Sequence, residues 1–572
     1  MYDLIIKGGL ILDGENHPPF YADLGILGGR IAAVAAPGTL QGRSCADVSG
    51  KLVTPGLIDA HTHADLSVLL YPDMRIWLKQ GVTTLVTGNC GHAMAPQGDE
   101  IFYQMINNVS FLEEAGGDPA KVLNTLLEKE SAQRALKKIY QIDADWETFG
   151  EFLDRADAAR PGCNLVPLAG YNAIRTKVMG RDCLRRAAPD EIKKLTAETE
   201  LCLQQGAFGL STGRDPLYVP GPYAGDEEMK PVLRCVAAHG GIFTSHTYNT
   251  SPEGICDRMG GYREMVRQAA GTGVRMHVSH VHVMGMAADS REALKKARET
   301  LDYFDALRSQ GIDLTYDTIT TACADYTLPY FSYYLRPLIL RCGTRSALSA
   351  AFGQPAFRAE VHEMVRNGVM DYFNPEAINW FGMIRVLWHK NSSAVGKTLQ
   401  ELADAAQADP LDTMMNLFRE DSEMRADMVY PDFSDAMDLL SRAPYAMPCS
   451  DGLGYDVDYN LTGIEQAPAY TNPANSCFIA DYMDRCSGLP LPETIYRASA
   501  FAASRFGIPG RGSIRVGNYA DLAVFGKDTG STDFSGFSFR EAELTFVNGN
   551  LAYVKGQDTA DTGRWGRVLR KC

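Results

Sequence analysis

The chain has 572 residues, 45% of them hydrophobic, so it can bury a large core and form several domains or one barrel with insertions. Its formal net charge of -15 argues against a nucleic-acid partner and against an anionic membrane surface. No run of about 18 apolar residues occurs, so no membrane-spanning helix is predicted. Thirteen cysteines without CxxC clusters, and an N-terminus without an export signal, predict a reduced, cytoplasmic protein.

Both ends of the chain have the pattern of short antiparallel strands and tight turns. Residues 3–55 alternate short apolar stretches with turn residues, as in DLIIKGGLILDG, and a similar texture returns at 511–525 and 543–556. We therefore expect one small β-sandwich domain built from residues 1–55 and 508–572. Two unrelated β segments are the alternative.

The region between these ends, residues 56–507, alternates strand-like with helix-like segments, which is typical of a parallel sheet covered by helices. Eight strand-like segments recur along it, at residues 52–63, 83–91, 164–171, 207–214, 241–248, 275–282, 313–320 and 445–452. Eight strands favour a (β/α)₈ barrel over an open sheet, and no Gly-x-Gly-x-x-Gly follows a strand.

Two stretches break this alternation and are predicted to be insertions. Residues 97–160 are rich in Glu and Lys and have a helical pattern, and residues 325–440 include the aromatic run DYTLPYFSYYLRP. The second insertion could form a lid or an oligomer interface, so a homo-oligomer stays open.

Metal-binding residue types recur where the predicted strands end. In LIDAHTHADL, His61 and His63 point to the same side of an extended strand and lie about 7 Å apart. The other donors in chain order are Cys90, His246, His280 with His282, and Asp451. In a parallel barrel these strand ends meet, and His, Cys and Asp are the ligands that zinc prefers. The sequence therefore predicts a metal site there.

Several motifs together resemble the amidohydrolase superfamily, and within it the N-acyl-D-amino-acid deacylase (D-aminoacylase) group. They are LIDAHTHADL, GVTTLVTGNCGHAMAP, FGLSTGRDPLYVPG, IFTSHTYNTSPEG, HVSHVHVMG, MPCSDG, GSIRVGNYADLAVF and TFVNG. The match runs nearly end to end, and GNCG with HTHAD is its most specific part. The resemblance implies a (β/α)₈ barrel, a split β-sandwich and a zinc-dependent hydrolase of amide bonds in small N-acylated substrates.

The resemblance also implies roles for individual residues. His61 and His63 match one metal position, His246 and His280 match another, and Cys90 is the thiolate that can bridge them. Asp451 matches the catalytic aspartate, which also belongs to the predicted ligand set. We expect one tightly bound zinc ion, with a second, weaker site left open.

The chemistry of the residues agrees with this interpretation. Zinc lowers the pKa of bound water to about 7 and polarises a carbonyl, which an unreactive amide requires. Asp451 would accept the water proton and pass it to the leaving nitrogen. Many relatives bridge two metals with a carboxylated lysine on the fourth strand, but the strand in NLVPLAGYNAIR has no lysine, and Lys177 lies several residues beyond that strand.

The substrate-binding residues depart from the deacylase pattern. The family's HPR…FPR arginine, which holds the substrate carboxylate, is missing from GLGYDVDYNLTGIEQAPAYTNPANS. Tyr218 matches the family's substrate-contacting tyrosine, and the other predicted substrate-binding residues are Arg175, Tyr248 and His282, with Arg214 as a further candidate cation. Both arginines could instead form structural salt bridges. Amide hydrolysis is thus the firmer prediction and the N-acyl-D-amino acid the softer one.

Two alternatives stay open at this point. A cyclic-amide hydrolase of the hydantoinase or dihydroorotase kind would share the barrel and the metal, but that group usually has the carboxylated lysine. A non-catalytic scaffold that has kept the barrel would ordinarily lose its ligands, and all six are present here.

Overall fold

The structure is a computed structural model, and it describes residues 1–101, 114–115, 126–215, 218–249, 257–283, 287, 289–320, 335, 338, 341–342, 344–367, 380–429, 432–452, 454, 477–527, 536–557 and 562–571. Residues 325–334 of the aromatic run, and most of the segment after Asp451, lie outside these ranges. None of the helices in the described part of the chain is both long and apolar enough to cross a membrane.

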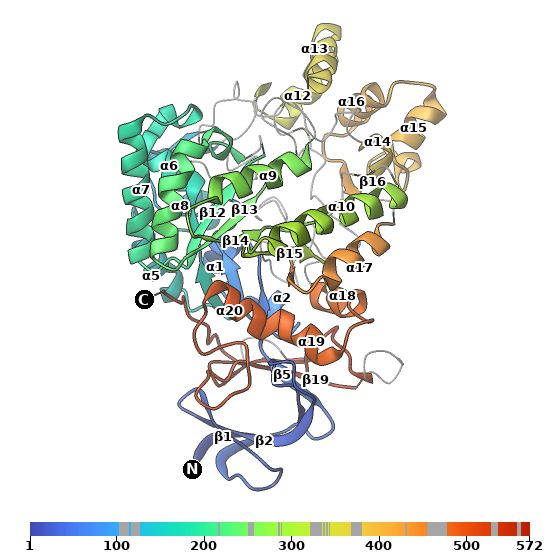
Figure 1. The fold of residues 1–572 in the computed structure, drawn as a ribbon. Coiled ribbons are helices and arrows are strands. Elements are labelled where there is room, and N and C mark those ends of the chain that lie inside the picture. The colour runs from blue at the N-terminus through green and yellow to red at the C-terminus, as the bar shows by residue number, and fades with distance from the viewer. Residues whose placement is uncertain are drawn as a thin grey trace.

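Eight parallel strands form a closed barrel in the middle of the molecule (Figure 1). They are β6 (Leu57–Asp59), β7 (Val82–Thr87), β10 (Asn164–Pro167) with its continuation β11 (Ala169–Gly170), β12 (Gly209–Gly213), β13 (Ile242–His246), β14 (Arg275–Val278), β15 (Leu314–Ile319) and β18 (Ala446–Cys449). The parallel bridge from Thr62 to Gly452 joins the last strand to the first. Each strand overlaps one of the eight segments that the sequence predicts, so the (β/α)₈ barrel is confirmed.

Helices connect consecutive strands and surround the barrel. They are α1 (Ala64–Leu70), α2 (Arg75–Leu78), α4 (Lys129–Tyr140), α5 (Phe149–Ala158), α6 (Tyr171–Met179), α7 (Pro189–Gln204), α8 (Asp226–Ala238), α9 (Arg258–Ala269), α10 (Ser290–Ser309), α17 (Ser434–Arg442), α18 (Phe478–Arg485), α19 (Leu491–Tyr496) and α20 (Ala502–Phe506). Within the predicted insertion 97–160, the short strands β8 (Glu100–Ile101) and β9 (Leu127–Glu128) pair, and α5 leads directly into β10.

Strands from both ends of the chain form one sheet, as the sequence predicts. The N-terminal strands are β1 (Tyr2–Ile11), β2 (Phe20–Leu27), β3 (Arg30–Ala35), β4 (Gly42–Asp47) and β5 (Leu52–Pro55), and the C-terminal ones are β19 (Leu522–Phe525), β20 (Leu544–Val547) and β21 (Asn550–Val554). The antiparallel pairing of β5 with β19 joins the two groups. The boundaries at residues 55 and 508 stay a prediction.

This terminal sheet packs against the amino ends of the barrel strands. At the start of β10, the Asn164 side chain donates to Asp521 at 3.3 Å and accepts from Asn548 at 2.9 Å. Near the start of β7, the Thr545 hydroxyl donates to the Leu78 carbonyl at 2.8 Å. The carboxyl ends, where barrels of this kind hold their sites, are therefore at the other end of the barrel.

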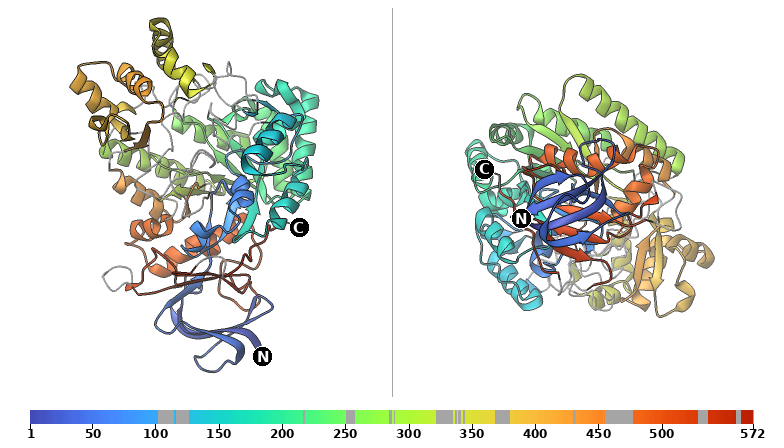
Figure 2. Two further views of the ribbon diagram at one scale, coloured as in Figure 1. Left: turned by 180° about the vertical axis from the view of Figure 1, so that it is seen from behind. Right: turned by 90° about the horizontal axis from the view of Figure 1, so that it is seen from below.

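The chain between β15 and β18 makes a long excursion, which contains α12 (Arg345–Ala351), α13 (Pro355–Arg366), α14 (Trp380–Met383), β16 (Ile384–Trp388), α15 (Leu399–Ala406), α16 (Pro410–Glu420) and β17 (Arg425–Met428). Its buried apolar side chains form a cluster separate from the barrel core. Both views from the side place it at the opposite end of the molecule from the terminal sheet (Figures 1 and 2). We call this segment the excursion below.

Candidate metal centre

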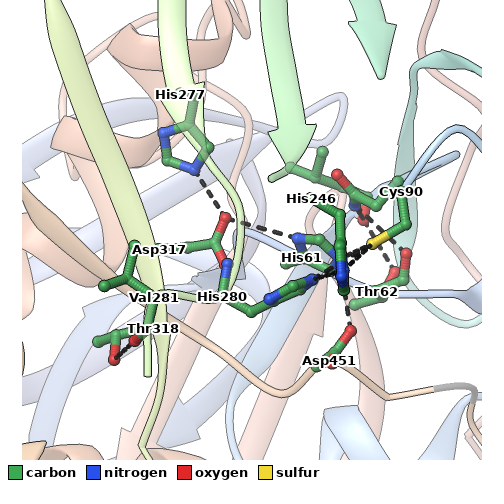
Figure 3. A network of polar contacts seen from close by, with 12 residues as sticks. His61, Thr62, Cys90, His246, His277, His280, Val281, Asp317, Thr318 and Asp451 are labelled. Carbon is green, nitrogen blue, oxygen red and sulfur yellow. Dashed lines mark hydrogen bonds and ion pairs between the residues drawn. The ribbon is translucent and has the colours of Figure 1, made fainter. Parts of the chain in front are cut away.

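The six predicted ligands come together at the carboxyl ends of five barrel strands, and Figure 3 shows five of them, all but His63. His61 and His63 follow β6, Cys90 follows β7, His246 ends β13, His280 follows β14 and Asp451 follows β18. The four histidines and Cys90 are buried, and the side chain of Asp451 is 20% exposed. Residues nearly 400 positions apart in the sequence thus share one site because parallel strands end on the same rim.

The Cys90 thiol lies at the centre of the histidines. Its Sγ is 3.3 Å from His61 Nε2, 3.4 Å from His280 Nε2 and 3.7 Å from His246 Nδ1. Tetrahedral zinc with the usual bond lengths separates a sulfur and a nitrogen ligand by about 3.6 Å. These spacings fit a zinc ion bound through Cys90.

Asp451 joins the same cluster from the other side. Its Oδ1 is 3.2 Å from His63 Nε2 and 3.4 Å from His61 Nε2. The ligand atoms of His61, Cys90 and His280 lie within 4.8 Å of one another, and so do those of His61, His63 and Asp451. His61 belongs to both groups, so the geometry has room for one ion at the thiolate and for a second, adjacent one.

The cluster buries negative charge that requires a positive partner. Burial would raise the pKa of the Cys90 thiol, but the charges of His61 and His280 lower it well below its usual value. Burial likewise opposes the charged form of His63, yet hydrogen bonding to Asp451 and Cys90 raises its pKa to about 9. Protons on the imidazoles thus compensate the thiolate and the carboxylate, and a divalent cation can take over that role.

Some buried ring nitrogens at the cluster have no hydrogen-bond partner in the described part of the chain. They include His63 Nδ1 and His282 Nδ1. Leaving such atoms unpaired costs free energy, so they mark a site built to bind something. Together with the donor set of two or more imidazoles, a thiolate and a carboxylate, they fit a zinc ion.

Backbone strain occurs at three of the ligands. Cys90, His280 and Asp451 have φ values of 55°, 33° and 51°, in the left-handed region that side chains other than Gly rarely adopt. Strain of this kind is held by the surrounding structure and gathers at functional sites. It aims these three side chains at one point rather than along their strands.

The GNCG turn shows why its residue types are needed. Gly88 has φ 76°, and a Cβ there would lie 2.1 Å from the Leu168 carbonyl oxygen. Asn89 donates to the carbonyls of Thr62 and Val86, at 3.3 and 3.0 Å, which ties the turn to the end of β6. The turn thereby holds Cys90 beside His61.

Three carboxylates that the sequence analysis did not single out support the ligands. Asp215 accepts from His246 Nε2 at 2.8 Å. Asp317 accepts from the His280 backbone N–H at 2.6 Å and contacts His277 Nε2 at 2.7 Å. Their position inside or directly after a predicted strand is the only sequence signal they carry, and Asp residues are common there.

The third carboxylate, Asp59, orients the turn that carries Asp451. Its Oδ2 accepts from Trp77 Nε1 at 2.9 Å and from the Ser450 hydroxyl at 2.5 Å, and its Oδ1 accepts from the Ser450 N–H at 3.0 Å. Burial raises the pKa of Asp59 to about 7 in spite of these donors. The hydrogen bonds tie the end of β18 to β6 and so fix Asp451 next to His61.

Two of the predicted substrate-binding residues lie beside the cluster. The ring of Tyr218 is 4.2 Å from that of His246, and the ring of His282 is 5.9 Å from that of His280. His282 Nδ1 is buried and has no hydrogen-bond partner among the described residues. The ring of His92, which the sequence analysis did not select, lies 5.0 Å from that of Tyr218.

The structure does not bring the other two to the cluster. Arg175 is fully buried and pairs with the Glu228 carboxylate, and its Nη2 also donates to the Cys183 carbonyl at 2.9 Å. Tyr248 turns its hydroxyl toward Gly260 at the start of α9. Arg214 also has a structural partner, because it forms two 2.9 Å contacts with Glu264.

Comparisons with known proteins identify the family of the chain. The sequence profile described as the Amidohydrolase family matches residues 45–553. D-aminoacylase of Alcaligenes xylosoxydans xylosoxydans is 28% identical, over 100% of this chain and 98% of that protein. Since the profile covers most of the chain, the protein belongs to the amidohydrolase family.

Two solved structures share the fold over the whole chain. One is N-acyl-D-glutamate deacylase from Bordetella bronchiseptica, complexed with zinc and a phosphonate inhibitor, with a TM-score of 0.67, 24% identity and coverage of 100% of this chain and 99% of that one. The other is a D-aminoacylase with a binuclear metal centre, with a TM-score of 0.66, 25% identity and coverage of 100% of both chains. The predicted resemblance to the deacylase group is therefore confirmed.

Proposed function

We propose that the protein is a zinc-dependent amide hydrolase that removes the acyl group from N-acyl-D-amino acids or a related N-acylated amine. The observation that carries the proposal is the Cys90 thiol, which lies within 3.7 Å of nitrogens of His61, His246 and His280 on one barrel rim. The similarity of the whole chain to D-aminoacylase supports the choice of substrate class.

His61, His63, Cys90, His246 and His280 would hold the metal. A tight zinc ion at Cys90 and a weaker second site beside Asp451 are the occupancies we propose. When bound, zinc supplies a water molecule whose pKa is lowered to about 7 and polarises the scissile carbonyl. Burial alone would raise the pKa of Asp451, but His280 and His63 hold it below its usual value, so the carboxylate is ionised at neutral pH.

Asp451 can therefore act first as a base and then as an acid. It accepts a proton from the attacking water as the new C–O bond forms at the carbonyl carbon. It then gives that proton to the nitrogen as the C–N bond breaks, so that the amine leaves neutral. Its side chain is 20% exposed, whereas the ligand histidines are buried.

The substrate would bind beside Tyr218 and His282. Tyr218 packs on His246 and His92, so its ring forms one wall next to the ligands. Arg175 pairs with Glu228, and Arg214 pairs with Glu264. Neither arginine therefore replaces the cation that the family uses to hold a substrate carboxylate. His282 is the remaining polar contact that we propose, and Arg175 is no longer part of the proposal.

Metal content combined with a substrate panel tests the proposal. The panel contains N-acetyl-D-amino acids, N-acetyl-L-amino acids, neutral N-acyl amines and a hydantoin, and each is assayed with the wild type, Cys90→Ala and Asp451→Asn. Cys202→Ala is the matched control, because Cys202 is also buried but lies in α7, away from the rim. The wild type and Cys202→Ala should bind about one zinc per chain and release amino acid with D-selectivity. Both site variants should lose the release of amino acid.

Each other outcome has a distinct meaning. Turnover of carboxylate-free amides alone would replace the amino acid by an acylated amine, and turnover of the hydantoin alone would favour a cyclic-amide hydrolase. Zinc without any turnover would favour a scaffold. A wild type that binds no zinc would contradict the mechanism.

We propose a cytoplasmic location as well. The ten described cysteines are all free, which suits a reducing compartment. Sedimentation of the purified chain would show whether it forms a homo-oligomer.

A further inference from the structure

We propose that Asp215 is the positioning residue for the ligand His246: it holds the imidazole so that Nδ1, and not Nε2, faces the metal position. The inference rests on the proposed metal centre. It concerns a residue from the loop between β12 and α8, which no ligand motif includes.

The two ring nitrogens of His246 have different neighbours. Nε2 is 2.8 Å from Asp215 Oδ2, whereas Nδ1 lies 2.7 Å from His280 Nε2 and 3.7 Å from Cys90 Sγ. An ionised carboxylate only accepts hydrogen bonds, so the proton of a neutral His246 must be on Nε2. The lone pair is then on Nδ1 and points into the cluster.

Asp215 is itself fixed by the backbone that follows His246. Its Oδ1 accepts from the Asn249 N–H at 2.7 Å, and its carbonyl accepts from the Tyr218 N–H at 2.8 Å. The carboxylate is therefore oriented on both oxygens, with only 14% of the side chain exposed. It cannot turn away from His246 without breaking the contact with Asn249.

The loop carrying Asp215 is tied to the same strand end as its partner. The Arg214 N–H donates to the His246 carbonyl at 2.9 Å, and the Arg214 side chain donates to the Ala224 carbonyl at 2.8 Å while pairing with Glu264. The buried guanidinium of Arg214 thus anchors the loop rather than binding substrate. The loop places Asp215 on one edge of His246 and Tyr218 on its face.

The outer nitrogens of two other ligand histidines lack a carboxylate contact as short as this one. Of the candidate ligands, His63 Nδ1 has no hydrogen-bond partner among the described residues, and His61 Nδ1 is 3.5 Å from Asp317. A carboxylate on the outer nitrogen fixes the tautomer, raises the basicity of the ligand nitrogen, and typically contributes about 10–100-fold to metal affinity. We expect that contribution from Asp215.

The test compares zinc affinity, measured by competition with a chromophoric chelator, in the wild type, Asp215→Asn and Asp215→Ala. Asp412→Asn is the matched control, because Asp412 Oδ1 contacts His362 Nε2 at 3.2 Å in the excursion. Zinc affinity should fall about 10–100-fold in both Asp215 variants and stay unchanged in the control. Added formate should restore part of the affinity of Asp215→Ala, because a small carboxylate can take the vacated position, whereas a merely structural defect would not respond.

Unchanged zinc affinity in the folded Asp215 variants, or an equal loss in Asp412→Asn, would overturn the inference. Asp215→Asn keeps the volume of the side chain, so it answers the question even where Asp215→Ala fails to fold. The proposed function can fail separately from this inference. A wild type that binds zinc but hydrolyses no amide would contradict the proposed function, whereas the comparison of zinc affinities would still test the role of Asp215.

Discussion

The carboxyl-end rim of the barrel and the excursion both bury side chains, but of opposite kinds. The rim buries histidines, a thiol and carboxylates, and leaves His63 Nδ1 and His282 Nδ1 without a hydrogen-bond partner within the described ranges. The cluster of the excursion consists of apolar side chains such as Phe352, Met414 and Phe418. Unpaired buried polar atoms cost stability, whereas apolar burial supplies it.

This difference indicates that the rim carries the function of the protein, whereas the apolar cluster of the excursion contributes stability. The rim carries positive φ values at three ligands and a set of mutually coupled charges, which a chain selected for stability alone would avoid. Changes at the rim should therefore lower activity or metal binding while the fold persists. Changes in the excursion should lower local stability while metal binding persists.

The largest effect is expected for Asp451→Asn. Removing the general base should lower kcat/KM by about 10²–10⁴-fold. Asn tolerates the positive φ of 51° at this position, so the turn should keep its conformation. The measurement is kcat/KM together with zinc content and the thermal midpoint. A loss of zinc or of folding equal to the loss of activity would contradict the contrast between the two regions.

Phe352→Ala tests the same comparison in the excursion. Phe352 is fully buried, with the rings of Phe357 and Phe418 at 5.9 and 5.8 Å, and its truncation should cost about 3–5 kcal/mol of local stability. Hydrogen exchange in α12 and α16 should rise sharply while zinc affinity stays at the wild-type value. Phe357→Ala, at a partly buried position of the same cluster, should give a smaller change. Loss of zinc in Phe352→Ala would show that the two regions are coupled.

Asp317→Asn should have an intermediate effect. Burial alone would raise the pKa of Asp317, but His61 and His277 hold it below its usual value, so an ionised group is lost. Zinc affinity should fall by about 10–100-fold, as for other partners of ligand residues. Asp313→Asn, at the opposite end of the same strand and paired with Arg505, is the control and should leave the chelator competition unchanged.

The smallest effect is expected on the outer surface, at Glu191→Gln in α7. Glu191 accepts from the Ala188 N–H at 2.7 Å and pairs with Arg185, which lowers its pKa to about 2. Because its pKa is lowered, the Glu191 carboxylate stabilises the fold at pH values above its usual pKa near 4.5. This stabilisation is lost as the pH falls toward 2. Since Arg185 is half exposed, the variant should lose only about 0.5 kcal/mol at pH 7.

Urea unfolding at pH 7, 5 and 4 measures this small effect. The difference between wild type and Glu191→Gln should be constant from pH 7 to pH 5 and should shrink below that. A difference that grows as the pH falls would contradict the sign.

The sequence by itself determined the strands of the barrel and the kinds of ligand on its rim. Period-2 alternation predicts that His61 and His63, which follow β6, point to the same side. The rule that parallel strands end on one rim brings Cys90, His246, His280 and Asp451 to them. Those inferences need only local periodicity and one topological rule. The same holds for the sheet made from both ends of the chain, whose strands are marked by their turns.

Only the tertiary structure decided which charged groups serve the site. Asp215 supports His246 and Asp59 orients Asp451, while Glu228 occupies Arg175 and Glu264 occupies Arg214. Each of these pairs joins residues that are 31 to 391 positions apart, as the hydrogen bonds from Asp215 to His246 and from Asp59 to Ser450 show. The sequence shows that a side chain is charged, but not whether its partner is a ligand, a substrate or another side chain. Packing in three dimensions determines that partner.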